Sequence, residues 1–239
     1  MISAPSLDLS IVVPIYNETE NLPELLAEID GVLGPLGLSY EITLVNDGST
    51  DGSETVLERL SSQFPALRVL HFEKNAGQSA ALHAGLNAAR GRLLVSLDGD
   101  LQNDPADIPA MLDLLETHDL VCGFRKNRRD TWSKRAASRI ANFVRSRFVG
   151  DGVRDTGCTL KAYRRGVIHT LPNFRGMHRF IPAFVKGHGY RITEMPVNHR
   201  ARIHGVSKYS VAGRAFKATR DMFGVRWLLA RRCPYTIRK

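Results

Sequence analysis

LSIVVPIYNE, residues 9–18, is an apolar run that ends in a tyrosine, an asparagine and a glutamate. A short, continuous apolar run is typical of a strand whose two faces are both buried in a sheet. Four more such runs follow before residue 125, and segments with the leucine or alanine spacing of a helix lie between them. A regular alternation of strand and helix with short connections predicts parallel strands joined by helical crossovers. The sequence therefore predicts an α/β fold with a mostly parallel sheet flanked by helices.

The expected elements form two groups that meet near residue 125. In the first group the strands are 9–14, 42–45, 68–72, 92–97 and 120–123, and the helices are 20–33, 51–62, 78–89 and 107–117. In the second group the helices are 133–148, 177–187 and 211–230, and the extended segments are 157–164 and 190–197. We expect one domain over residues 1–210, with halves 1–125 and 126–210, and a C-terminal extension over residues 211–239.

The composition is that of a globular protein. Of the 239 residues, 43% are hydrophobic and 24% are charged, and these values exclude a disordered, collagen-like or coiled-coil chain. Three widely spaced cysteines, Cys122, Cys158 and Cys233, fit neither a disulfide framework nor a zinc knuckle, and they favour a reducing, cytoplasmic setting. The first residues lack the pattern of a signal peptide, and no apolar run reaches the ~18 residues of a membrane span.

The formal net charge of +9 conceals a strong segregation of charge along the chain. Residues 1–120 carry 5 Lys and Arg against 19 Asp and Glu, whereas residues 121–239 carry 28 Lys and Arg against 5 Asp and Glu. The two halves therefore have net charges of −14 and +23. An acidic half is suited to hold a cation, and a basic half is suited to meet an anion or an anionic surface.

Polar loops follow three of the predicted strands. These loops are 14–18 (PIYNE), 46–52 (NDGSTDG) and 98–102 (DGDLQ). In open α/β sheets, ligands bind beyond the carboxyl ends of the strands, which is where these loops lie. Each loop taken alone also has a structural interpretation, because Asp51 can cap a helix, residues 46–48 can form a turn, and Glu18 can face a helix dipole.

Asp98 and Asp100 are harder to explain by structure alone. Only Gly99 separates these two carboxylates, which follow an apolar strand, so their mutual repulsion calls for a cation. Carboxylate oxygens select a hard ion such as Mg²⁺ or Mn²⁺, and Gln102 is placed to add a neutral oxygen. The sequence contains no glycine-rich dinucleotide fingerprint and no Walker loop. A metal with few protein ligands at a sheet edge suits a reaction in which a nucleoside diphosphate is the leaving group, because the metal neutralises the negative charge of the diphosphate.

The motifs follow one another in a characteristic order. The order is PIYNE (14–18), NDGSTDG (46–52), NAGQSAALHAG (75–85), DGDLQ (98–102), DTGC (155–158) and RIHGVSKY (202–209). It resembles that of family 2 glycosyltransferases of the GT-A fold, and more narrowly the polyprenyl-phosphate sugar transferases, the group of dolichol-phosphate mannosyltransferase and its bacterial undecaprenyl-phosphate relatives. The resemblance runs from residue 9 to residue 230. It implies a Rossmann-like half over 1–125 that binds a nucleotide diphosphate sugar and an acceptor half over 126–210.

The resemblance implies roles for individual residues. On the donor side, Pro14, Tyr16 and Glu18 would contact the base and the ribose, and Asp47 would form a hydrogen bond with the base. Asp98, Asp100 and Gln102 would bind Mg²⁺ or Mn²⁺. Arg202 and Lys208, in a loop that also contains Arg200, would contact the diphosphate. On the acceptor side, Arg125, Arg135 and Arg139 would bind the phosphate, although the last two also fit a solvated basic helix face.

Catalysis would rest on Asp100, Arg125, Asp155 and Lys208. Asp155 would orient groups near the sugar or only hold its own turn. His178 and Arg179 would contact the sugar or the acceptor, or have a structural role.

The implied reaction transfers a hexose, with GDP-mannose or UDP-glucose as the expected donor, to a dolichyl or undecaprenyl phosphate with inversion at the anomeric carbon. A phosphate monoester is already ionised near neutral pH, so it needs no general base. Residues 173–182 carry no carboxylate where other branches of the family have a Glu-Asp pair.

Three other interpretations stay open. The chain could be a soluble family 2 enzyme that glycosylates a saccharide or protein hydroxyl, a nucleic-acid-binding protein, or a non-catalytic nucleotide-sugar binder. We expect no nucleic-acid partner, because the acidic half would repel a phosphate backbone.

The C-terminal segment 211–232 is cationic and amphipathic. Its apolar stripe is Val211, Ala215, Ala218, Met222, Val225 and Leu229, extended by Phe216, Phe223 and Trp227. The segment is either an interfacial helix on an anionic membrane surface or a helix packed on the core with a basic outer face. Many members of the implied family continue into transmembrane helices after this point. We therefore expect a peripheral enzyme on the inner, cytoplasmic face of the membrane, or one held there by a membrane-anchoring partner protein.

Overall fold

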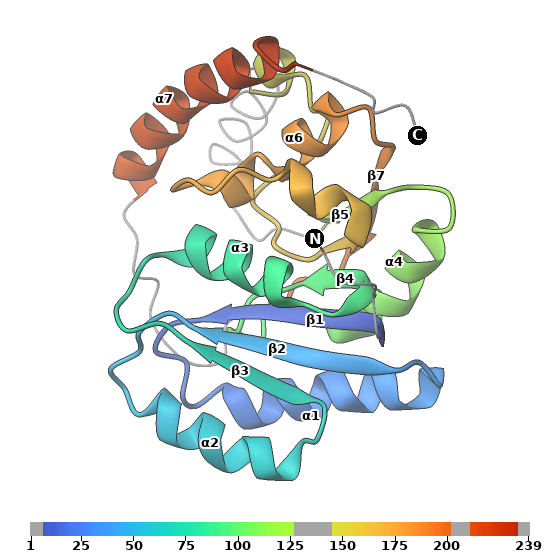
Figure 1. Ribbon diagram of the computed structural model, residues 1–239, viewed down its shortest axis with the longest axis vertical. Helices are drawn as coiled ribbons and strands as arrows, with labels where there is room; N and C mark the ends of the chain where they lie inside the picture. Colours follow the sequence, from blue (N-terminus) through green and yellow to red (C-terminus); the bar gives the residue numbers. More distant parts are fainter. Residues whose placement is uncertain (1–6, 127–144, 202–210, 234–239) are drawn as a thin grey trace.

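The computed structural model describes residues 7–126, 145–201 and 211–233. Its centre is a seven-stranded sheet with the order β3-β2-β1-β4-β6-β5-β7 (Figure 1). The strands are β1 (Leu7–Ile15), β2 (Tyr40–Asn46), β3 (Leu67–His71), β4 (Gly91–Ser96), β5 (Leu120–Arg125), β6 (Lys161–Arg164) and β7 (Ile192–Val197). The mostly parallel α/β sheet predicted from the sequence is thereby confirmed.

β1 lies at the centre of the parallel half, where it pairs with β2 on one side and β4 on the other. Ile11, Val12 and Val13 are fully buried, because successive side chains of this strand pack into the cores on opposite faces of the sheet. All five strands predicted before residue 125 are present. The carboxyl ends of β1, β2 and β4 therefore meet at one edge.

β6 runs antiparallel to the other described strands of the sheet, and it lies between β4 and β5. Because of this insertion, β5 and β7 continue the parallel direction of β4 without touching it. The predicted extended segment 157–164 contains β6, but the sequence gave no indication of the direction of this strand or of its place in the sheet. The strand brings Lys161 and Tyr163 into the middle of the sheet, where both are buried.

Helices cover both faces of the sheet. On one face lie α1 (Leu22–Leu33), α2 (Ser53–Gln63) and α4 (Ile108–Leu114), and on the other lie α3 (Gln78–Ala88), α6 (Ile181–Gly187) and α7 (Val211–Ala230), as Figure 1 shows. Short 3₁₀ turns η1 (Gly34–Leu36), η2 (Pro105–Asp107), η3 (Arg165–Thr170) and η4 (Met177–Arg179) connect these elements. Of the predicted helix 133–148, residues 145–148 are helical, and the remainder lies outside the described residues.

Gly85 allows α3 to lie directly on the sheet. A Cβ atom at this position would be 2.5 Å from Val12 Cγ1 and 2.9 Å from Val45 Cγ2, whereas a Cβ at Gly31 of α1 would meet nothing within 4 Å. Both glycines lie inside helices, so alanine improves the helix propensity equally at the two sites.

We predict that Gly85→Ala lowers the free energy of unfolding by about 1–3 kcal/mol, because the added methyl group overpacks the core. Gly31→Ala is the matched control, and it should raise the same quantity by up to about 1 kcal/mol. Urea unfolding of both variants measures the two effects. Equal effects of the two substitutions would contradict the close packing of α3 on β1.

Candidate active site

Asp98 and Asp100 lie directly beyond the end of β4, at the carboxyl edge of the sheet. Asp98 accepts a hydrogen bond from Gln78 Nε2 (2.9 Å), and its own backbone N–H donates to Asn103 Oδ1 (3.0 Å). Burial raises the pKa of Asp98 to about 6, and the negative charge of Asp100 adds to this shift. Asp100 is 7% exposed, and its carboxylate accepts a hydrogen bond from the backbone N–H of Gln102 (3.2 Å).

The backbone at Leu101 turns the chain sharply between Asp100 and Gln102. Its φ of 59° is in the left-handed region, where a residue with a Cβ is disfavoured by ~1–2 kcal/mol. The fully buried Leu101 side chain offsets this cost, because it is part of the core that lies under α1 and α4. Nothing in the sequence reveals this strained turn, since leucine has no preference for it.

The oxygen donors at this edge fit a hard divalent cation. No group of three or more His, Cys, Asp and Glu side chains suited to a metal occurs in the part of the chain that the structure describes. The candidate ligands are therefore two carboxylates and the amide oxygen of Gln102. Mg²⁺ is usually bound by one or two carboxylates together with substrate phosphates. A cation here would compensate the buried charge of Asp98 and the repulsion from Asp100, which together raise the pKa of Asp98.

Asp47 joins the loop after β2 to the loop before α3. Its buried carboxylate accepts hydrogen bonds from Asn75 Nδ2 (2.9 Å), Ala76 N (2.7 Å) and Gly77 N (2.9 Å). The loops approach closely at Gly48, where φ is +66° and a Cβ would be 2.5 Å from Asn75 N. The contact of Asp47 with a nucleotide base stays a prediction, and the contact that the structure shows is with the neighbouring loop.

The loops after β1 and β2 are also bonded to each other. Asn17 donates its backbone N–H to Ser49 Oγ (2.9 Å) and accepts a hydrogen bond from the backbone of Thr50 on its side-chain oxygen (2.8 Å). The side chains expected to contact the base and ribose flank this connection and are partly exposed: Pro14, Tyr16 and Glu18. The side chains expected to contact the base and the ribose therefore lie at one edge of the sheet, and their contact with a nucleotide stays a prediction.

Arg125, at the end of β5, forms a bidentate ion pair with Asp155. Its Nε lies 2.7 Å from Asp155 Oδ2, and a terminal nitrogen lies 2.9 Å from Oδ1. Burial opposes both charges, but the hydrogen bonds and charges of the pair outweigh it, so the pKa of Asp155 is lowered and that of Arg125 is raised. The sequence predicted roles for these two residues separately, whereas the structure joins them.

Lys161 is a buried cation that the sequence interpretation missed. Lys161 is only 2% exposed, and its Nζ donates to the carbonyl oxygen of Cys158. Its positive charge offsets part of the rise in the pKa of Asp98 and contributes to the lowered pKa of Asp155. A lysine inside a short extended segment gives no signal of burial, because lysine in a strand is ordinarily solvated. Lys161 supplies a fixed positive charge beside the acidic strand end.

His178 bonds to the first turn of α3. Its Nδ1 lies 2.8 Å from Ser79 Oγ, which also accepts the backbone N–H of Gly176 (2.9 Å). Burial lowers the pKa of His178 to about 3, with a further contribution from the charge of Arg179. His178 is therefore neutral at physiological pH, and its observed contact is structural.

Four predicted site residues lie outside the described residues: Arg135, Arg139, Arg202 and Lys208. Their phosphate contacts stay predictions.

The chain belongs to glycosyl transferase family 2, whose family model matches residues 10–171. It is 42% identical over 230 residues to dodecaprenyl-phosphate galacturonate synthase of Rhizobium johnstonii, and the alignment covers 94% of this chain and 68% of that protein. It is 39% identical over 206 residues to undecaprenyl-phosphate 4-deoxy-4-formamido-L-arabinose transferase of Edwardsiella ictaluri, with 85% of this chain and 63% of that protein covered. The chain thus spans about two thirds of the length of these relatives. The predicted family is confirmed.

Solved structures share the GT-A fold of this chain. Glucosyl-3-phosphoglycerate synthase of Mycobacterium tuberculosis, in complex with Mn²⁺ and UDP-glucose, has a TM-score of 0.71 at 20% identity, covering 92% of this chain and 79% of its own. The mannosyltransferase PcManGT of Pyrobaculum calidifontis, in complex with GDP-Man and Mn²⁺, has a TM-score of 0.67 at 21% identity, covering 98% of this chain and 68% of its own. These structural neighbours hold a divalent metal and a nucleotide sugar.

We predict that His178 makes the protein less stable in mild acid. The unfolded chain takes up a proton on this imidazole near pH 6.5, whereas the folded protein does so only near pH 3. The free energy of unfolding therefore falls as the pH drops below 6.5, by up to about 1.4 kcal/mol per pH unit. In His178→Asn, which keeps a polar atom near Ser79, this part of the pH dependence should disappear. Urea unfolding at several pH values measures it, and an identical slope in both proteins would contradict the lowered pKa.

Proposed function

We propose that the protein is an inverting glycosyltransferase that moves a sugar from a nucleotide diphosphate sugar to a polyprenyl phosphate. The observation that carries this proposal is the 42% and 39% identity to two proteins named for sugar transfer to dodecaprenyl and undecaprenyl phosphate. The polar edge of the sheet supports it, because it combines candidate metal ligands with a paired arginine beside them.

The donor binds at the loops after β1, β2 and β4. A divalent cation held by Asp98, Asp100 and Gln102 would act as a Lewis acid that neutralises the diphosphate as it leaves. The loops joined by Asn17 and Asp47 provide a rigid wall for the base and the ribose. Arg202 and Lys208 stabilise negative charge on the leaving group.

The acceptor phosphate supplies its own nucleophile. One of its anionic oxygens attacks the anomeric carbon, the bond from that carbon to the diphosphate oxygen breaks, and the electron pair leaves with the nucleoside diphosphate. No proton has to be removed, so no general base is needed. Asp155 fits this scheme, since its carboxylate is paired with Arg125 and its lowered pKa makes it a weak base. Arg125 has further N–H donors for the phosphate, together with Arg135 and Arg139.

The expected donor sugar is a hexose or a hexuronate, and a pentose derivative is the alternative. GDP-mannose and UDP-glucose are the candidates from the sequence, and the relatives add galacturonate and 4-deoxy-4-formamido-L-arabinose as sugars to test. A transfer assay with these donors, Mn²⁺ and undecaprenyl or dolichyl phosphate, followed by counting label in the organic phase, distinguishes them. Label that appears only on a saccharide acceptor would favour the hydroxyl-directed alternative.

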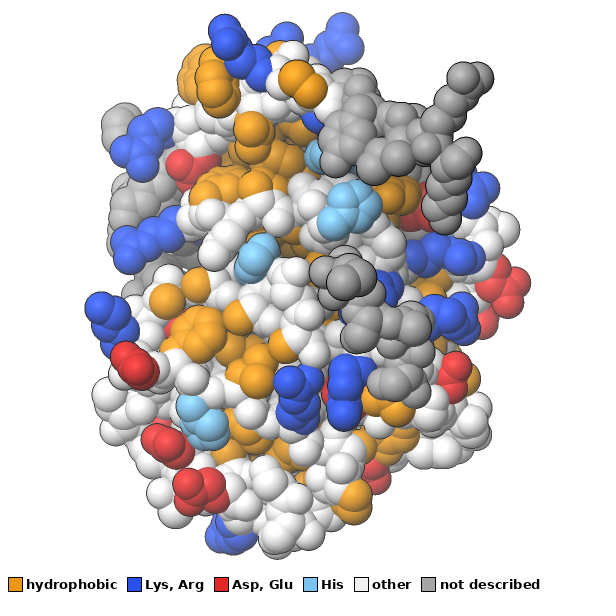
Figure 2. Space-filling view, viewed as in Figure 1, with side chains coloured by type: hydrophobic (Ala, Val, Ile, Leu, Met, Phe, Trp, Pro, Cys, Tyr) orange, Lys and Arg blue, Asp and Glu red, His pale blue; other side chains and the backbone are white. Residues whose placement is uncertain are grey.

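The outer face of α7 suits an anionic membrane surface. Phe223 and Trp227 are 62% and 60% exposed, whereas Val225 of the same helix is buried in the core. Exposed arginines lie along this helix and just beyond it: Arg220, Arg226, Arg231 and Arg232. Figure 2 shows the resulting mixture of basic and apolar side chains at the α7 end of the molecule. Aromatic and basic side chains together are typical of helices that lie in a membrane interface.

One face of α7 packs on the core and the other is exposed, so core packing leaves an outer face that can contact a membrane. Across the described residues, no helix is both long and apolar enough to cross a membrane. We place the protein on the cytoplasmic face of the membrane, where polyprenyl phosphate is accessible, with a membrane-anchoring partner protein as an additional means of attachment.

We predict that Asp100→Asn reduces sugar transfer by at least about 100-fold, because the neutral side chain is a poorer metal ligand. Asp113→Asn in α4 is the matched control, since Asp113 is exposed and lies outside the site, and it should retain full activity. Transfer by the unchanged protein should also stop when EDTA removes the metal and resume when Mn²⁺ is restored. Full activity of Asp100→Asn, or activity in EDTA, would refute the assigned metal site.

Trp227→Ser combined with Phe223→Ser should weaken binding to vesicles of phosphatidylglycerol and phosphatidylcholine by at least about tenfold, since burial of aromatic side chains drives interfacial binding. Leu36→Ser is the control, because Leu36 is an exposed apolar residue in η1. Vesicle sedimentation measures the binding. If Leu36→Ser weakens it as much as the α7 variant does, α7 is not the binding face.

A further inference from the structure

The chain beyond β7 is attached to the loop that follows the candidate metal ligands. Asn198 donates its backbone N–H to Asp107 Oδ2 (2.7 Å), and His199 forms a β-bridge with Asn103. The backbone N–H of Arg200 donates to the carbonyl oxygen of Gln102 (2.9 Å). Two segments about one hundred residues apart in the sequence therefore run side by side next to Asp98 and Asp100.

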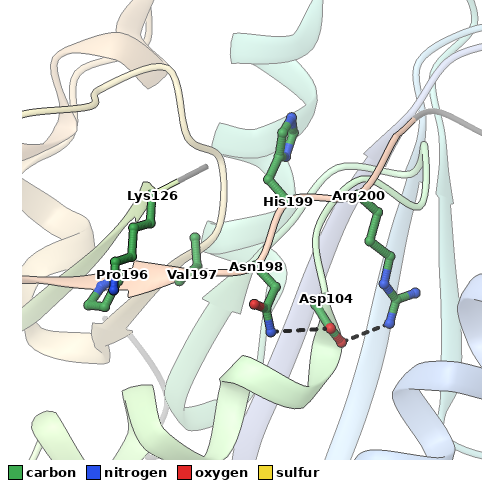
Figure 3. Close-up of a pocket in the computed structure, with 7 residues that line it drawn as sticks. All are labelled: Asp104, Lys126, Pro196, Val197, Asn198, His199 and Arg200. Atoms are coloured by element: carbon green, nitrogen blue, oxygen red, sulfur yellow. Dashed lines mark hydrogen bonds and ion pairs between the residues drawn. The ribbon is translucent and has the colours of Figure 1, made fainter. Parts of the chain in front are cut away.

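The guanidinium of Arg200 holds two carboxylates from different elements. One terminal nitrogen lies 2.5 Å from Glu28 Oε1 in α1, and the other lies 2.8 Å from Asp104 Oδ1 just before η2. Figure 3 shows the Arg200 side chain extended toward Asp104, with Asn198 reaching the same carboxylate. These two ion pairs hold the Arg200 side chain against α1 and the segment before η2. The guanidinium therefore braces the loop that carries Gln102.

The backbone of Arg200 also fixes the side chain of Gln102. Gln102 Nε2 approaches the carbonyl oxygen of Arg200 at 3.4 Å. Because a carbonyl oxygen only accepts hydrogen bonds, the amide NH₂ must face it, and the amide oxygen must point the other way. The backbone N–H of Gln102 donates to Asp100 Oδ1 (3.2 Å), so the same residue also orients a candidate ligand.

We propose that Arg200 is a positioning residue for the divalent metal, a role that rests on the proposed function. Its two ion pairs and two backbone hydrogen bonds hold residues 102–104 in place. That support is required because Leu101 has a left-handed backbone, and such a turn persists only where its surroundings determine it. Without the guanidinium, Glu28 and Asp104 lose their shared cation. The loop that carries Gln102 can then relax away from its present position beside Asp100.

The test uses the affinity of the full chain for Mn²⁺ alone, measured by the EPR signal of free Mn²⁺. Removing a positive charge near a cation site should by itself strengthen Mn²⁺ binding, whereas loss of positioning should weaken it. We expect Arg200→Met to weaken Mn²⁺ binding by about tenfold, which corresponds to about 1.4 kcal/mol. Arg200→Lys keeps the charge and should recover part of the affinity. Unchanged or tighter binding in Arg200→Met would overturn the proposal.

Arg191→Met is the matched control, because Arg191 lies at the opposite end of β7 and pairs with Asp119 at 4.0 Å. It should leave Mn²⁺ affinity unchanged while its melting temperature stays close to that of Arg200→Met. Equal weakening by both variants would show a general loss of structure and overturn the positioning role. Asp100→Asn separates the two claims: if it binds Mn²⁺ like the unchanged protein, the metal site itself is misassigned. Normal Arg200→Met affinity with weakened Asp100→Asn affinity would overturn only the role of Arg200.

Discussion

The repulsion between Asp98 and Asp100 is the constraint around which the candidate site is arranged. Parallel strands bring their carboxyl ends to one edge, and the chain places two carboxylates there, one of them with a pKa raised to about 6. Among the described residues, cations around this edge have defined partners: Lys161 bonds to the Cys158 carbonyl, Arg125 pairs with Asp155, and Arg200 pairs with Glu28 and Asp104.

The same arrangement explains why a phosphate is a suitable acceptor. A hydroxyl acceptor needs a carboxylate with an accessible proton-accepting oxygen and a pKa near neutrality. Asp155 has the opposite properties, because Arg125 bonds to both of its carboxylate oxygens and lowers its pKa. An already ionised phosphate avoids this requirement. In the proposed scheme it arrives from a membrane surface, which the exposed aromatic and basic face of α7 would contact. The acidic half of the chain would then meet the metal and donor, and the basic half the anionic acceptor.

Local pattern was sufficient to predict much of the fold and little of the internal geometry of the site. Apolar runs such as 9–14, which lies inside β1, predicted all five strands before residue 125, and the spacing of 211–230 predicted α7 with its observed bounds. The placement of β6 between β4 and β5 was not predictable, because strand order depends on contacts between distant segments. The pairing of Arg125 with Asp155 and of Arg200 with Glu28 was missed for the same reason. Leu101 and Lys161 were missed because each residue lies in an environment that its type ordinarily avoids.

The central claim is that the nucleophile is a phosphate oxygen, and the chemical structure of the product tests it most directly. The lipid product of a preparative reaction would be isolated and examined by ³¹P and ¹H NMR. The account predicts that the phosphomonoester signal of the polyprenyl phosphate is replaced by that of a phosphodiester, with the sugar attached through its anomeric carbon in the configuration opposite to that of the donor. An unchanged lipid phosphomonoester together with a new glycosidic bond to a hydroxyl, or retention of the donor's anomeric configuration, would contradict it.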